Sequence, residues 1–129
     1  MRIQIASDLH LESLRRRFVD YRALDVAVHA STRPEPFGRT IAEAMSCGRA
    51  LVIAREGGAA ELVTDGVDAL AVVPREPDLL AEALLSLAKD PGLRARLGAA
   101  ARVTAAARYS RGRIGPEILT AYTRIRAEG

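Results

Sequence analysis

Residues 24–48 read LDVAVHASTRPEPFGRTIAEAMSCG, and this stretch decides the fold expected for the chain. Its first part, residues 24–30, is a short apolar run rich in valine, which is typical of a strand buried on both faces of a parallel sheet. Residues 39–47 have the spacing of an amphipathic helix, with Ile41 and Met45 on one side and a glycine just beyond the end. The stretch therefore predicts a strand, a loop and a helix in succession.

The same alternation continues on both sides of this stretch. Short apolar runs at 2–6, 50–54 and 69–73 predict three more strands, and residues 59–63 predict one or two helical turns. Alternating strands and helices indicate the α/β class, with a Rossmann-like open parallel sheet of about four strands. We find no linker or repeat, so residues 1–129 are expected to form one domain, a partial one for the reasons below.

The pattern from Pro77 onward is entirely helical. One helix follows Pro77, a second begins at Pro91, where proline suits the first helical turn, and a last amphipathic helix covers residues 114–125. We expect these C-terminal helices to cover one face or edge of the sheet.

Composition excludes several classes of protein. The chain has 129 residues, with 49% hydrophobic and 27% charged residues, which is ordinary globular composition. A single cysteine excludes an internal disulfide, and no apolar run has the ~20 residues that span a bilayer or the form of a signal peptide. We therefore expect a cytoplasmic protein.

Positive charge is concentrated near the C-terminus, where residues 91–129 carry eight arginines against two acidic residues. Such a segment is compatible with nucleic-acid binding or with a solvated helical face. The aromatic residues of this segment are Tyr109 and Tyr122, and both fit the spacing of a helical core and not of a stacking platform. We therefore favour the helical face and expect no nucleic-acid partner.

The loop between the strand and the helix of residues 24–48 carries the chemistry. Ligands of open α/β sheets bind at the carboxyl ends of strands, which is where this loop lies. Gly38 allows either a positive φ or close approach of a ligand, and the free amides from Gly38 to Thr40 favour an anion such as phosphate. Glu35 and Glu43 flank these amides and can accept hydrogen bonds from sugar hydroxyls. As an isolated pair, they are better explained without a ligand, Glu43 as an ordinary helix residue and Glu35 as a partner of the helix dipole.

Glu35-Pro36-Phe37-Gly38 followed by Glu43 resembles the Glu-x7-Glu signature of the group 1 retaining glycosyltransferases of the GT-B architecture. Residues 23–31 resemble the strand before that signature, and residues 57–63 resemble the family's Gly-Gly-x-x-Glu loop. The resemblance covers roughly residues 18–127. It implies part of the C-terminal, donor-binding domain, whose ligand is a nucleotide-activated sugar.

The resemblance also implies roles for individual residues. Glu35 would be the catalytic residue, near the transferred sugar. Backbone amides at Phe37 and Gly38 would meet that sugar, Arg39 and Thr40 would face the diphosphate, and Glu43 would hold the ribose hydroxyls. The implied donor-binding residues are thus Phe37, Gly38, Arg39, Thr40 and Glu43. No metal or cofactor is implied, and Cys47 is expected to be a buried structural thiol.

Some family features have no match in this sequence. Complete enzymes have an N-terminal acceptor domain and, in the first strands of the donor domain, a basic pair that clamps the diphosphate. The only lysine here is Lys89, far from the signature. Without the clamp we expect the chain alone to be inactive in transfer. Its expected partners are a nucleotide-activated sugar and either the missing acceptor domain or a second copy joined at an exposed sheet edge.

The first 12 residues resemble something else, the opening strand of calcineurin-like metallophosphoesterases, in which Asp8 and His10 would ligate metal. The chain has no asparagine and one other histidine, His29, so one copy cannot complete a dinuclear site. We interpret Asp8 as a helix N-cap and residues 1–17 as a foreign strand and helix, whose strand replaces a lost one in the sheet. Two alternatives to donor binding stay open: a non-catalytic or chimeric α/β scaffold, and a metallophosphoesterase-like fragment.

Overall fold

The structure is a computed structural model that describes residues 1–6, 21–34 and 38–128. Within these ranges the sheet has four parallel strands in the order β1-β2-β3-β4. Ile3 lies beside Val26, and Val26 lies beside Ala50 on the next strand. All four expected strands are confirmed, and residues 3–6 take the edge position beside β2. The strands are β1 (Ile3–Ala6), β2 (Val26–His29), β3 (Ala50–Ala54) and β4 (Leu70–Val72).

The helices also follow the sequence signals. Pro77 and Pro91 each stand at the start of a helix, and the Asp90 carboxylate accepts a hydrogen bond from the Leu93 amide at 2.9 Å, which caps the second of these helices. The α-helices are α1 (Arg39–Ser46), α2 (Pro77–Lys89), α3 (Pro91–Arg108) and α4 (Ile114–Glu128). The described residues also form three short 3-10 turns, η1 (Tyr21–Ala23), η2 (Gly58–Glu61) and η3 (Arg111–Arg113).

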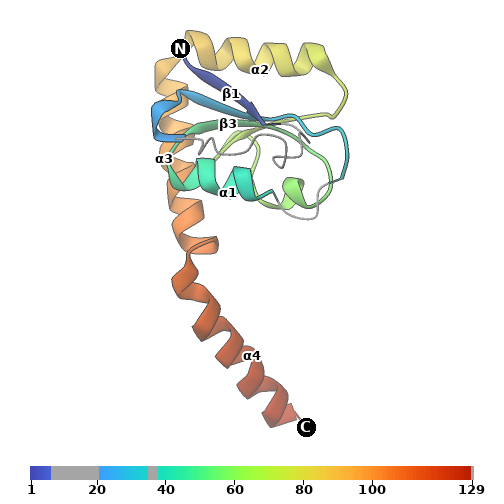
Figure 1. Ribbon diagram of the computed structural model, residues 1–129, viewed down its shortest axis with the longest axis vertical. Helices are drawn as coiled ribbons and strands as arrows, with labels where there is room; N and C mark the ends of the chain where they lie inside the picture. Colours follow the sequence, from blue (N-terminus) through green and yellow to red (C-terminus); the bar gives the residue numbers. More distant parts are fainter. Residues whose placement is uncertain (7–20, 35–37, 129) are drawn as a thin grey trace, which may run out of the picture.

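Two hydrophobic clusters sandwich the sheet, with α2 on one face and α1 on the other (Figure 1). Successive residues of a strand point to opposite faces, so Leu51 of β3 packs with α1 whereas Val52 packs with α2. Helix α3 belongs to both clusters, because its Leu97 joins the α2 side and its Ala101 joins the α1 side. The expected open α/β sheet is therefore confirmed, with helices on both faces.

Helix α4 departs from the expectation. It points away from the rest of the molecule (Figure 1), and none of its residues is buried. Its apolar side chains Ile118, Leu119 and Ile125 are 64%, 65% and 68% exposed. The expectation that all the C-terminal helices cover the sheet is thus wrong for α4, because the apolar stripe of a helix does not say what covers it. No helix in the described ranges has the length and apolar character needed to cross a membrane.

Candidate functional site

Helix α1 begins at the carboxyl edge of the sheet, after β2 and the loop that follows it. Its N-cap is Gly38, which has no side chain to accept a hydrogen bond from the first turn. The Gly38 carbonyl oxygen accepts from the Ile41 amide at 3.0 Å and the Ala42 amide at 3.2 Å. The amides of Arg39 and Thr40 precede these two, so they are the donors that the helix itself leaves unpaired. An anion at this end of α1 would meet them and the positive end of the helix dipole.

Gly38 does not have the backbone conformation suggested by the sequence. Its φ is −84°, so the prediction of a positive φ is wrong. A Cβ placed on Gly38 would lie 2.6 Å from Cδ1 of Ile41, which is fully buried. The absent side chain thus makes room for a core residue, and a Cβ would point toward Ile41 and not toward a ligand.

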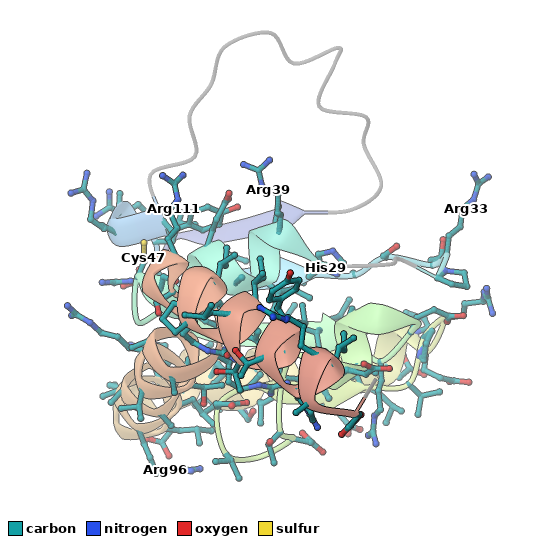
Figure 2. All side chains as sticks on the ribbon, turned by 90° about the horizontal axis from the view of Figure 1, so that it is seen from below. His29, Arg33, Arg39, Cys47, Arg96 and Arg111 are labelled. Atoms are coloured by element: carbon teal, nitrogen blue, oxygen red, sulfur yellow. The ribbon has the colours of Figure 1, made fainter. Side chains whose placement is uncertain are left out.

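A cleft of about 950 Å³ lies along the exposed side of α1. Its other wall is formed by the end of α3, by η3 and by the start of α4, and Tyr21 of η1 contributes to it. Arg39, Cys47 and Arg111 lie on the same side of the molecule (Figure 2). The lining residues of α1 and the turn after it are Arg39, Ala42, Glu43, Ser46 and Cys47, and those opposite include Arg108, Tyr109, Arg111, Arg113 and Glu117. Four arginines and two glutamates give this cleft a net positive lining.

Glu43 is the acidic group of α1 in this cleft. The Arg39 guanidinium lies 3.5 Å away, but the two side chains are 86% and 46% exposed, so the pair contributes little stability. Tyr21 of η1 lines the same cleft as Glu43. Burial, with a further effect of the Glu43 charge, raises the pKa of Tyr21 to about 12. At neutral pH, Tyr21 is therefore a protonated donor.

The predicted donor-binding residues take different positions in the structure. Arg39 and Glu43 line the cleft together, one helical turn apart. Gly38 is buried and Thr40 is half-buried, both at the start of α1. Glu35 and Phe37 lie outside the described residues, as do Asp8 and His10 of the N-terminal resemblance.

Three features of the cleft were missed or misplaced by the sequence analysis. Cys47 is half-buried and lines the cleft, so the expectation of a buried thiol is wrong. Tyr21 and Arg111 were not predicted at all. The charge of residues 91–129 did indicate an arginine-rich surface, but no spacing rule connects Arg111 with α1.

Metal ligands are not gathered in the part of the chain that the structure describes. Across residues 1–6, 21–34 and 38–128, no three His, Cys, Asp or Glu side chains lie close enough together to hold a metal ion.

The parallel sheet and the helix that starts at its carboxyl edge beside a polar cleft define a Rossmann-like α/β domain. Residues 19–104 match the model of the family described as glycosyl transferases group 1. The chain therefore belongs to the group 1 glycosyltransferases, and the family resemblance of the sequence is confirmed. The match begins after the first 12 residues, which carry the other resemblance.

Curated relatives support the same family. The chain is 44% identical over 89 residues to the D-inositol 3-phosphate glycosyltransferase of Xylanimonas cellulosilytica. The aligned region covers 68% of this chain and 21% of that protein. The chain is 39% identical over 106 residues to the protein of the same name from Actinosynnema mirum, covering 82% of this chain and 25% of the relative. The chain thus spans about a fifth to a quarter of the length of these relatives.

Solved structures agree on the fold. Anabaena Alr3699/HepE in complex with UDP superposes with a TM-score of 0.76 at 36% identity, covering 81% of this chain and 29% of that one. The complex of the same protein with UDP-glucose gives a TM-score of 0.74 at the same identity and coverage. Sucrose-phosphate synthase from Thermosynechococcus elongatus gives 0.75 at 29% identity, covering 84% of this chain and 27% of that one.

Proposed function

We propose that this chain binds a nucleotide-activated sugar at the start of α1 and is the donor-binding portion of a retaining glycosyltransferase. The observation that carries the proposal is the place of Glu43, in the cleft one turn after the uncapped start of α1. Four residues of helix correspond to about 6 Å along the axis, the scale of the step from a diphosphate to the adjoining ribose. One ligand can therefore reach the first amides with its phosphates and Glu43 with its hydroxyls.

The family places this proposal in context. The Anabaena neighbour, at 36% identity, was crystallised with UDP and with UDP-glucose. Uridine diphosphate is accordingly the first nucleotide to test on this chain. The D-inositol 3-phosphate glycosyltransferases named above suggest the class of reaction for a complete protein.

The remaining roles follow from the signature and belong to the same proposal. Glu35 acts near the transferred sugar, and the amides of Phe37 and Gly38 contact that sugar. Arg39 and Thr40 face the diphosphate. Arg39 suits this role because its guanidinium is largely exposed and its contact with Glu43 is a weak one.

Transfer itself requires more than these residues. The leaving nucleotide carries negative charge, and the stabilisation of such charge is a large part of catalysis. The relatives are four to five times longer than the matched region, so we assign the acceptor-binding half and the diphosphate clamp to chain outside it. We expect the isolated chain to bind the donor weakly and to transfer no sugar.

An open sheet edge offers the alternative partner, a second copy. At β4, the Asp65 carboxylate accepts from the Ala71 amide at 2.8 Å and the Arg55 guanidinium reaches the Ala71 carbonyl at 3.5 Å, so side chains cover that edge. At β1, β2 is the one neighbouring strand among the described residues. Pairing between copies would therefore involve β1. Sedimentation over a range of concentrations distinguishes a monomer that awaits an acceptor domain from a self-associating chain.

Calorimetry with UDP tests the ligand. We expect wild type to bind and Glu43→Gln to weaken binding by about 1–3 kcal/mol, or roughly 5- to 150-fold, because a charged acceptor is lost. Glu82→Gln, on α2 at the opposite face of the sheet, is the matched control and should bind as wild type does. Equal affinities for wild type and Glu43→Gln would remove the ribose role of Glu43.

A further inference from the structure

Two loops at the carboxyl edge of the sheet are joined by one side chain. Arg75 follows β4, and its guanidinium donates a hydrogen bond to the Thr32 carbonyl at 2.7 Å. Thr32 follows β2, and the strand order places β3 between the two loops. The contact between Arg75 and Thr32 therefore crosses the carboxyl end of β3, at the edge of the sheet where ligands of such folds bind.

Arg75 has a backbone conformation that favours glycine. Its φ is 63°, and in the part of the chain that the structure describes it is the one residue other than glycine with a positive φ. This left-handed conformation is unfavourable for any residue with a Cβ. Strain of this kind is found preferentially at functional sites. Glycine would suit the turn between β4 and α2 better, so the turn alone does not account for an arginine here.

The start of the loop after β2 is also held by its own side chains. Ser31 is buried, and its hydroxyl donates to the Arg33 carbonyl at 2.9 Å and accepts from the Arg33 amide at 3.4 Å. Thr32 lies between these two residues, so Arg75 binds the middle of this turn. The turn is thus closed by Ser31 and tied to the end of β4 by Arg75. Support from two sides keeps a loop within a narrow range of positions.

We propose that Arg75 is a positioning residue that fixes the loop between β2 and α1 for binding of the donor's sugar. This inference rests on the proposed function, which assigns contacts with the sugar to Glu35, Phe37 and Gly38 of that loop. Arg75 acts through the Thr32 carbonyl and not by touching the ligand. A loop that is held before the ligand arrives loses less conformational entropy on binding. Because the proposed partners of the diphosphate and the ribose lie on α1, the effect concerns the sugar and not the nucleotide.

Calorimetry with UDP and with UDP-glucose tests the proposal. We expect Arg75→Ala to lower the affinity for UDP-glucose about 3- to 10-fold. The affinity for UDP should change less than about twofold, because UDP has no sugar to contact the loop. Arg75→Lys keeps a cationic hydrogen-bond donor on a long side chain, so it should recover part of the loss.

Arg75→Gly separates the role of the guanidinium from the strain of the backbone. It removes the same hydrogen bond as Arg75→Ala, but glycine accepts the positive φ. Its melting temperature should therefore be about 2–5 °C above that of Arg75→Ala. Both variants should nevertheless bind UDP-glucose equally weakly. If affinity instead follows stability, so that Arg75→Gly binds UDP-glucose as wild type does, the role of Arg75 is structural and the positioning role is overturned.

Arg96→Ala is the matched control. The Arg96 guanidinium donates to the Gly66 carbonyl at 3.1 Å, so it too joins an exposed arginine to a loop. Gly66 precedes β4 and thus lies at the opposite edge of the sheet, and Arg96 is far from Arg33, the neighbour of Thr32, in Figure 2. Arg96→Ala should bind both ligands as wild type does. A loss of UDP-glucose affinity equal to that of Arg75→Ala would indicate a general effect and overturn the positioning role.

The remaining outcomes separate the two proposals. If Arg75→Ala binds UDP-glucose as wild type does, or loses affinity for both ligands to the same extent, the positioning role is overturned and donor binding stands. If wild type binds UDP but not UDP-glucose, the sugar has no site on this chain, and the positioning role is overturned while nucleotide binding stands. If wild type binds neither ligand, donor binding by this chain fails, and the positioning role fails with it.

Discussion

Gly38 precedes α1 with a φ of −84° and a ψ of 83°, so it is not held in the left-handed region that favours glycine. What its position requires is the absence of a Cβ, which would lie 2.6 Å from Cδ1 and 3.0 Å from Cγ1 of Ile41. Ile41 is fully buried and packs in the cluster on the α1 face of the sheet. It therefore has little space into which to retreat. The loop and the core meet at this pair of residues.

We predict that Gly38→Ala destabilises the chain by about 1–3 kcal/mol through overpacking. Ile41→Val removes Cδ1 and should by itself cost about 0.5–1.5 kcal/mol. In the double variant the clash is relieved, so its loss in the free energy of unfolding should be smaller than the sum of the two. Urea unfolding of the four proteins measures this. Additive losses would show that Ile41 is not the obstacle. Because φ of Gly38 is negative, Gly38→Asn should be no more stable than Gly38→Ala.

For individual residues, the sequence predicted part of the candidate site. Periodicity and the glycine before the helix were enough to place Arg39 and Glu43 one turn apart at the start of α1. Tyr21 was not predictable, because its place in the cleft depends on a turn that Arg49 holds against the end of α1. No local pattern records a contact of that kind. Glu35 and Phe37 lie outside the described residues, so their roles stay predictions.

Helices α1 and α3 meet at two glycines. Gly48, after the end of α1, has a φ of 64°, which is the common way for a helix to end. Gly98 lies buried within α3, and a Cβ there would be 2.3 Å from the Gly48 carbonyl oxygen. The backbone of α3 thus touches the turn after α1. The obstacle is a backbone atom, which cannot rotate away as a side chain would.

Gly98→Ala should therefore destabilise the protein, although the same change in an exposed helix interior stabilises it by about 1 kcal/mol. We expect a net loss of about 1–3 kcal/mol in the free energy of unfolding, because α3 must move away from Gly48. Gly115→Ala in α4 is the matched control, since a Cβ there meets nothing within 4 Å. Thermal unfolding compares the two, and a higher melting temperature for Gly98→Ala would contradict the close contact.

At the scale of elements, the sequence predicted the strands and helices because each has a strong local pattern. Short valine-rich runs predicted β2 and β3, and proline at a first turn predicted α2 and α3. The contact of Gly98 with Gly48 was not predictable. From the sequence alone, a glycine within an alanine-rich helix is expected only to destabilise that helix. Its contact with a neighbouring backbone is visible only in the structure.

At the scale of the whole molecule, α4 is the element that contributes least to the core. None of its residues is buried. The Arg113 guanidinium of the preceding turn donates a hydrogen bond to the Glu117 carboxylate of α4. A surface pair of this kind contributes little to stability. The rest of the chain should therefore fold without α4.

We predict that ending the chain after Arg113 changes the free energy of unfolding by less than about 0.5 kcal/mol. Ending it after Ala100 is the control, because that deletion also removes Ala101 and Ala105, which are buried beneath α1. The shorter protein should be unfolded by circular dichroism. A clear loss of stability in the longer one would mean that α4 packs on the domain after all.

The sequence anticipated the class of the molecule better than the place of its last helix. Alternating strands and helices predicted the parallel sheet, since few other arrangements bury such strands on both faces. The apolar stripe of α4 predicted a helix and its apolar side, but it did not identify an element that packs against that side. The cytoplasmic location and the absence of a nucleic-acid partner stay predictions.

Helix α3 has a consequence that extends beyond its own contacts. Leu97 is part of the cluster on the α2 face, whereas Ala101 and Ala105 are part of the cluster on the α1 face. A helix that is shared in this way cannot leave one cluster without disturbing the other. The two layers of the domain are thus bound into a single cooperative unit, and they should open to hydrogen exchange together and not one after the other.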